Sequence, residues 1–379
     1  MNRESGKKGN ILRDDGFQTI AGSLLCIIIG LLAGYIVLLI INPGGAGKAI
    51  LAILKNFLYY PSAAASMKYF GTTLVKASAL LMCSLSVLFA WKVGLFNIGA
   101  AGQYVIGAGA SLYFGLQFGM PWYVCLLAAV LAAAVVGGIS GALKAYFNVN
   151  EVISCIMLNW IGLYCVNMLL TKVKEQSTPY TRPLGSTNKS ALLPNAGLDS
   201  LFSRNEFVTI GVPLAVLMAV IVWILLEKTK FGYELKATGM NKNAAKYCGM
   251  REKRNIIVTM MIAGGLAGFG AGIFYLSGIE QWMVQQTSIP AMGFNGIAAA
   301  FLGGSNPIGA VFSSYFIQHI TSGGTYVDKT MYCTQISDLI SAFIIYLCGF
   351  VLFFKLKLNR YLDRRDEKLA AKEQKGGEA

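Results

Sequence analysis

Eight long apolar stretches constrain the fold of this 379-residue chain more than any other feature. An α-helix needs about 20 consecutive apolar residues to cross the hydrocarbon core of a bilayer. The eight stretches cover residues 18–41, 72–91, 97–118, 121–147, 152–171, 207–226, 256–278 and 336–354. Two shorter stretches, 291–304 and 307–321, meet at a tight turn. We therefore expect an all-α, polytopic membrane protein with about ten transmembrane helices, two of them short or broken.

Basic residues predict how the chain is oriented. Eight Lys or Arg residues fall within 227–255, and a dense basic loop of a membrane protein lies in the cytoplasm. Ten crossings then place residues 172–205 in the longest external loop and both termini inside. We expect a cytoplasmic segment over 1–17, a transmembrane domain over 18–354 and a basic cytoplasmic tail over 355–379. The net charge of +14 does not indicate a nucleic-acid partner, because the positive residues are divided between the two sides of the membrane and do not form one binding face.

The basic cytoplasmic loop contains a short segment that favours a helix. Asn241 can cap this helix at its start, Ala244 and Ala245 have high helix propensity, and Gly249 can terminate it. Together with Lys246, these residues would form a docking element that stands out from the membrane. The alternative is a basic loop that only sets the topology.

The sequence argues against several kinds of chemistry. It has no G-x-x-x-x-G-K-[ST] motif, so we expect no ATPase site in this chain. The 18 Asp and Glu residues fall in loops, tails or helix ends, whereas proton-coupled carriers typically need an ionisable relay inside the membrane. The eight Cys residues are scattered without a C-x-x-C spacing, so we expect no metal site. We expect no catalytic residues in this chain.

Glycine is abundant on one face of the stretch over 256–278. Gly264, Gly268 and Gly272 recur every four residues, a spacing that allows close approach of helices in lipid. We therefore expect this face to pack tightly against another helix.

Two similar segments predict a route for a solute. LFNIGAAGQYVIGA at 95–108 and GFNGIAAAFLGGSN at 293–306 enter the membrane from opposite sides in the ten-crossing topology, as an inverted repeat would. Chance similarity in a glycine-rich chain is the alternative. Asn97 and Asn295 each lie within two residues of a glycine at an expected helix break.

Amides and aromatic rings in and near these segments could line a cavity. The candidate residues along the solute path are Phe96, Asn97, Gln103, Asn159, Phe294 and Asn295. A pocket of neutral amides and rings suits a neutral, flat, polar solute. The alternative is that each amide only makes hydrogen bonds between helices.

Four motifs in this order resemble the permeases of bacterial ABC importers for branched-chain amino acids, simple sugars and nucleosides, and are most similar to the nucleoside branch. The motifs are FNIGAAGQ at 96–103, NEVISCIMLNW at 150–160, ATGMNKNAAKYCGM at 237–250 and GFNGIAAAFLGGSNPIGA at 293–310. The resemblance covers almost the whole chain. One departure is Ala101, where the branch commonly has an acidic residue.

The resemblance implies a multi-pass subunit of the bacterial plasma membrane that imports a nucleoside or a related neutral polar solute. It implies three partners, namely a second permease, an ABC ATPase that binds ATP and Mg, and an extracytoplasmic lipoprotein that delivers the solute. The chain itself would need no cofactor, and the loop over 236–254 would dock on the ATPase. The alternatives are a permease for simple sugars, an ion-coupled secondary carrier and a non-transporting membrane scaffold.

Overall fold

A computed structural model describes residues 15–333 and 335–348, together with positions 350, 353, 356–357 and 360. Its helices are α1 (Asp15–Ile41), α2 (Ala46–Lys55), α3 (Ala63–Lys92), α4 (Ala100–Gln117), α5 (Trp122–Phe147), α6 (Glu151–Leu170), α7 (Leu184–Thr187), α8 (Leu198–Leu201), α9 (Gly211–Lys228), α10 (Lys230–Met240), α11 (Lys242–Tyr247), α12 (Glu252–Tyr275), α13 (Met292–Leu302), α14 (Pro307–Gly323) and α15 (Ile336–Cys348). Short 3-10 turns cover Asn56–Tyr59, Thr171–Val173, Lys189–Ala191 and Gly324–Tyr326. The described residues contain two isolated β-bridges and no strand. The predicted all-α fold is confirmed.

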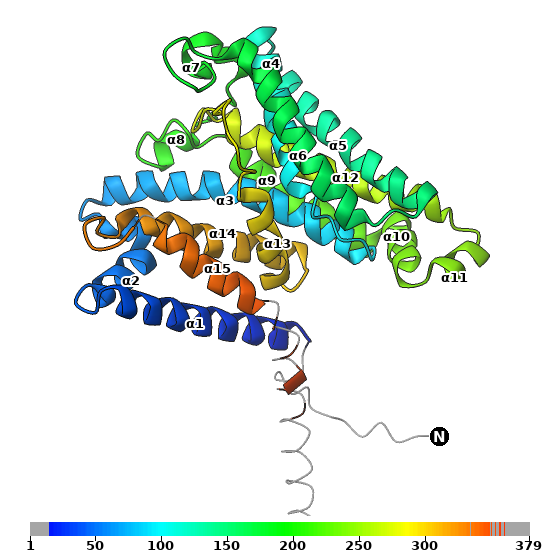
Figure 1. The fold of residues 1–379 in the computed structure, drawn as a ribbon, viewed down its shortest axis with the longest axis horizontal. Coiled ribbons are helices and arrows are strands. Elements are labelled where there is room, and N and C mark those ends of the chain that lie inside the picture. The colour runs from blue at the N-terminus through cyan, green and yellow to red at the C-terminus, as the bar shows by residue number, and fades with distance from the viewer. Residues whose placement is uncertain are drawn as a thin grey trace, which may run out of the picture.

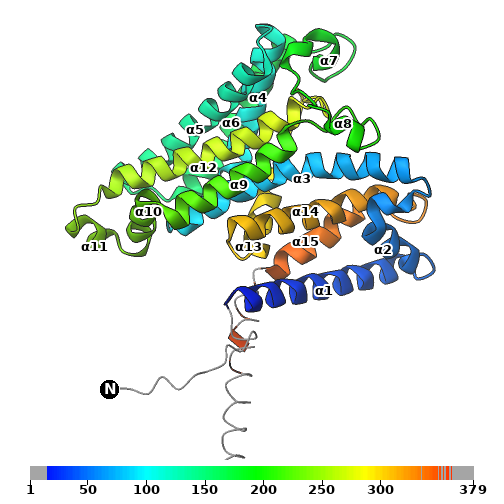
Figure 2. The same ribbon diagram turned by 180° about the vertical axis from the view of Figure 1, so that it is seen from behind.

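Helix α3 lies between two groups of helices. Helices α4, α5, α6, α9 and α12 lie on one side of it, and α1, α2, α13, α14 and α15 lie on the other (Figures 1 and 2). Each group has its own apolar core, and α3 contributes to both, through Leu85 to the first and Leu80 to the second. All residues from Ala77 to Ala90 are buried. The chain therefore folds around α3 as a central helix.

The glycine face of α12 packs against α5, as the sequence predicts. A Cβ atom on Gly268 would lie 2.5 Å from the Ala133 Cβ, and one on Gly272 would lie 2.6 Å from a methyl group of Leu126. Gly264 contacts the backbone of Ala133 equally closely. Any larger residue at these positions would push the two helices apart.

The lengths of the helices agree with a multi-pass membrane protein. Six helices of the described region are long and apolar enough to cross a bilayer, and α4 adds 18 residues, which span about 27 Å. Helices α13 and α14 are shorter and meet at the predicted tight turn over 303–306. The second predicted span begins earlier than expected, at Ala63 rather than residue 72. Most of the predicted segments 1–17 and 355–379 lies outside the described residues.

The two predicted loops lie at opposite ends of the molecule. The segment 172–205 carries α7 and α8 at one end, and α10 and α11 lie at the other (Figures 1 and 2). The segment 227–255 is largely helical. The sequence predicted the short helix in it but not α10, the longer one.

Candidate functional site

An irregular segment over residues 93–99 separates α3 from α4. Gly94 lets the chain leave α3, because its φ of 74° lies in the left-handed region that glycine adopts without strain. Asn97 lies within this segment and is fully buried. Its Nδ2 donates to Ser86 Oγ at 3.0 Å and to Gln103 Oε1 at 2.8 Å, and its Oδ1 accepts from Gln103 Nε2 at 3.2 Å. The helix break predicted at Asn97 is confirmed, and its amide pairs with that of Gln103.

Asn159 of α6 acts as the cap of α4. The N-cap residue of α4 is Gly99, which has no side chain to accept from the first N–H groups of the helix. The Asn159 Oδ1 takes that place and accepts from Gly102 N at 2.9 Å, while its Nδ2 donates to Ile98 O at 3.1 Å. A Cβ on Gly102 would lie 2.5 Å from the Asn159 Cα, so only glycine permits this approach. The structure therefore pairs Asn97 with Gln103 and places Asn159 beside them, bonded to the backbone of Ile98 and Gly102. We call these three residues the amide cluster.

The second half of the predicted repeat differs from the first. Asn295 lies inside α13, which begins at Met292, so the helix break predicted there is wrong. Gly293 and Gly296 do not interrupt the helix; they allow other helices to pack closely against α13. A Cβ on Gly293 would lie 2.6 Å from Ala101 N, and one on Gly296 would lie 2.7 Å from the Cys83 Cβ. The tight contact with Gly293 also leaves little room for an acidic side chain in place of Ala101.

The aromatic candidates lie near the irregular segment without joining the amide cluster. The Phe96 ring makes an edge contact with Trp91 at 6.2 Å, and Trp91 makes another with Phe301 of α13 at 5.1 Å. Phe294 is 39% exposed, and Asn295 is half-buried without a side-chain hydrogen bond to any described residue. The two predicted segments thus pack against each other, but only the first carries buried, hydrogen-bonded amides.

Helix α11 has the caps that the sequence predicts. The Asn241 Oδ1 accepts from Ala244 N at 3.0 Å, and Gly249 follows the helix with a φ of 80°. Ala245 is buried, so its side chain holds α11 on the protein, whereas Lys246 and Tyr247 are exposed. The exposed face of α11 is therefore free to contact another protein.

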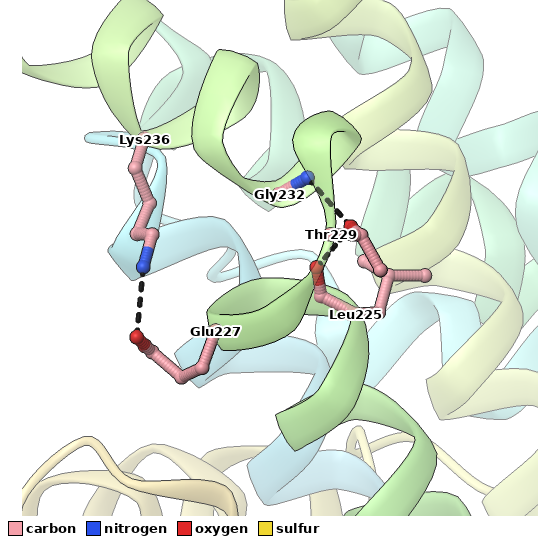
Figure 3. A network of polar contacts seen from close by, with 5 residues as sticks. All are labelled: Leu225, Glu227, Thr229, Gly232 and Lys236. Carbon is pink, nitrogen blue, oxygen red and sulfur yellow. Dashed lines mark hydrogen bonds and ion pairs between the residues drawn. The ribbon is translucent and has the colours of Figure 1, made fainter.

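The corner between α9 and α10 is fixed by polar contacts (Figure 3). The Thr229 hydroxyl accepts from Gly232 N at 3.0 Å and donates to Leu225 O at 2.6 Å. Lys236 Nζ lies 2.9 Å from Glu227 Oε2, which ties α10 back to α9. A Cβ on Gly232 would lie 2.7 Å from the Leu226 Cα. These contacts hold α10 at one angle to α9.

Helix α10 also contacts the irregular segment that carries Asn97. A Cβ on Gly94 would lie 2.9 Å from the Gly239 carbonyl oxygen, and one on Gly239 would lie 2.9 Å from Gly94 N. The Asn255 Nδ2 donates to Thr238 Oγ1 at 2.9 Å, which binds α10 to α12 as well. The sequence pattern did not predict this helix, although Thr229 is a typical N-cap residue. The contact joins the α10–α11 segment directly to the segment next to the amide cluster.

Comparison with known proteins identifies the kind of membrane protein. The chain is 32% identical to the guanosine ABC transporter permease protein NupP of Bacillus subtilis, over 85% of this chain and 90% of that protein. It is 31% identical to the nucleoside ABC transporter permease protein NupB of Lactococcus lactis, over 89% of this chain and 92% of that protein. A second Bacillus subtilis protein, the guanosine ABC transporter permease protein NupQ, is 31% identical over 64% of this chain and 77% of its own length.

No solved structure matches the chain. A family model does, and it is described as the permease component of a branched-chain amino acid transport system; the match extends over residues 69–349. The chain therefore belongs to this family of membrane permeases.

Proposed function

We propose that this chain is the permease of an ATP-driven importer that moves a nucleoside or a related neutral polar solute into the cell by alternating access. NupP and NupB, which are named for guanosine and nucleoside transport, support this substrate class because they match 85% and 89% of the chain. The α10–α11 segment carries the proposal, since it offers an exposed, capped helix fixed to the bundle. ATP and Mg would bind to a separate ATPase, and this chain would hold no cofactor.

The mechanism follows from the contacts of that segment. Helix α11 docks on the ATPase through the face around Lys246, and the fixed corner at Thr229 makes α10 move with it. The contact between Gly239 and Gly94 then passes the displacement to the irregular segment. Movement of this segment breaks hydrogen bonds of the amide cluster, because these bonds join the segment to α3, α4 and α6.

The solute path would run beside this segment. Asn97, Gln103 and Asn159 would offer amides when the cluster opens, and Phe96, Phe294 and Asn295 would line the same side of the bundle. An amide hydrogen bond contributes about 0.5–1.5 kcal/mol net, so the exchange between internal and solute partners costs little. Such an exchange is what a transporter needs, because the solute must leave as readily as it enters.

The partners follow from the same proposal. Two guanosine permeases of Bacillus subtilis, NupP and NupQ, both resemble this chain, which supports a pairing of two related permeases. The ABC ATPase would bind on the cytoplasmic side, and a solute-binding lipoprotein would deliver solute on the outer side. Both termini and the segment 227–255 would lie in the cytoplasm of a bacterium.

An uptake experiment tests the function. Cells that carry the complete transporter should accumulate radiolabelled guanosine, and cells lacking only this chain should not. Excess unlabelled inosine should compete with the label, whereas excess glucose should not. Competition by glucose alone would favour a sugar permease. Uptake that survives depletion of ATP would favour an ion-coupled carrier and overturn the proposal.

A further inference from the structure

A cavity of about 690 Å³ is lined in part by Leu184 and Gly185 of α7. Helix α7 lies at the opposite end of the molecule from the α10–α11 segment (Figure 1). The other walls come from residues within 180–195 and 275–281, from Glu206 and Phe207, and from Leu112 of α4. The volume falls within the range of about 300–1,000 Å³ that is usual for small-molecule sites. Nothing in the mechanism above uses this cavity.

The walls of the cavity are joined by hydrogen bonds between distant parts of the chain. Thr181 N donates to Trp282 O at 2.9 Å, Trp282 N donates to Thr181 Oγ1 at 3.2 Å, and Leu193 N donates to Leu276 O at 2.9 Å. Trp282 is buried, and its Nε1 donates to Asn167 Oδ1 of α6 at 2.9 Å. The cavity is therefore a preformed hollow with fixed walls.

Two polar groups at the cavity lack partners. Tyr275 lines the cavity and is only 5% exposed, and its hydroxyl makes no hydrogen bond within the described part of the chain. Arg182 donates from Nη2 to Leu116 O at 3.3 Å, but its buried Nε has no partner. Buried polar groups are nearly always hydrogen-bonded, so the Arg182 guanidinium points to an occupant of the cavity, and the Tyr275 hydroxyl is a further group on the wall that can bond to it.

Acidic groups on the same walls define the charge of that occupant. Glu206 and Glu280 line the cavity, and neither forms an ion pair with a described residue. Partial burial raises the pKa of the Glu280 carboxyl, although the ammonium of Lys76 on α3 opposes the shift. Two carboxylates against one guanidinium disfavour an anion. They suit an uncharged molecule with several hydroxyl donors.

Aromatic groups complete the site. Tyr180 lines the cavity and is 40% exposed, so its ring offers a surface for a flat heterocycle. Tyr275 lines the cavity from the end of α12, with its ring packed against Phe274 and Trp282. The combination of carboxylates, one guanidinium and tyrosines matches a nucleoside, whose sugar hydroxyls donate and whose base both stacks and accepts.

We propose that this cavity is a receiving site, in which a neutral nucleoside binds after its delivery at the outer side and before it moves into the membrane. The inference rests on the proposed function and adds a location for the solute. In this site the sugar hydroxyls donate to Glu280 and Glu206, and Arg182 donates to the base. A segment of the lipoprotein is the alternative occupant, and the affinity of the variants for the lipoprotein distinguishes the two.

The test uses the complete transporter in proteoliposomes and compares Glu280→Gln and Tyr275→Phe with Asp199→Asn. Asp199 lies on α8 at the same end of the molecule but does not line the cavity. Measurements are the guanosine concentration for half-maximal uptake and the affinity of the transporter for the lipoprotein. Glu280→Gln should raise that guanosine concentration about tenfold, as the loss of a hydrogen bond to a charged group does. Tyr275→Phe should raise it about threefold, as the loss of a neutral hydrogen bond does.

The outcomes separate this inference from the proposed function. Both variants should keep wild-type affinity for the lipoprotein, and Asp199→Asn should behave as wild type. If the wild-type transporter is active and Glu280→Gln needs the same guanosine concentration for half-maximal uptake, the receiving site is wrong but the proposed function stands. The receiving site is also wrong if weaker binding of the lipoprotein accounts for the whole change in uptake, because the cavity would then hold the partner protein. If the wild-type transporter takes up no guanosine, the proposed function fails and this inference fails with it.

Discussion

The contact between Gly239 and Gly94 gives the sharpest test of how α10 acts on the rest of the chain. In Gly239→Ala the new Cβ would press on the Val93 carbonyl group and lie 2.9 Å from Gly94 N. Backbone atoms cannot rotate away as a flexible side chain could, so the cost lies in the upper part of the usual range for overpacking, at about 2–3 kcal/mol. Alanine regains up to about 1 kcal/mol over glycine in a helix. A net cost of about 1–2 kcal/mol weakens the contact roughly 5- to 30-fold.

The assay measures guanosine transported per ATP hydrolysed by the complete transporter in proteoliposomes. Gly239→Ala should lower this ratio about fivefold or more, while ATP hydrolysis continues, because α11 can still dock. The matched control is Gly47→Ala in α2, where a Cβ would meet no atom within 4 Å. It should keep the wild-type ratio. A wild-type ratio in Gly239→Ala as well would refute the idea that this contact transmits movement.

Three further predictions concern the ends of the molecule. Lys246→Glu should reduce the amount of ATPase that copurifies with the permease, because Lys246 lies on the exposed face of α11. In variants that retain one cysteine, a membrane-impermeant maleimide should label exposed Cys333 on intact cells but exposed Cys248 only after lysis. As the pH is lowered, guanosine uptake should begin to weaken at a higher pH than it would if Glu280 had the pKa of an ordinary glutamate. Burial raises the pKa of Glu280, and the opposing charge of Lys76 does not cancel this shift. The carboxylate therefore takes up its proton at a higher pH than an ordinary glutamate does. Glu280→Gln should abolish that part of the pH dependence.

Features that depend on neighbouring residues in the sequence were predictable. The caps of α11 rest on Asn241 and Gly249, which act within a few residues of their own positions. The glycine face of α12 was equally clear, because a four-residue spacing has one meaning in a helix that packs in lipid. The long apolar stretches determined the fold class for the same reason, since the bilayer sets their length.

Features that depend on distant contacts were not predictable. Gly99 and Gly293 look alike in sequence, yet one ends an irregular segment and the other packs α13 against Ala101. The role of Asn159 was not predictable either, because its partners Gly102 and Ile98 lie 57 and 61 residues away in the sequence. Helix α10 was not predicted because it contains two glycines, which usually disfavour a helix. Both of them lie where another part of the chain approaches the backbone.

Helix α4 links the two ends of the proposed transporter. It begins at Ala100, directly after the segment that Gly239 contacts, and its Leu112 lines the cavity. The twelve residues between these points rise about 18 Å along one rigid helix. Because Asn159 bonds to Ile98 of this segment and to Gly102 of α4, a displaced segment carries the start of the helix with it. Docking at α11 and solute in the cavity then bias the position of one shared element. Coupling of this kind is reciprocal. If docking of the ATPase changes the affinity of the permease for guanosine by a certain factor, guanosine in the cavity must change the affinity of the permease for its ATPase by the same factor.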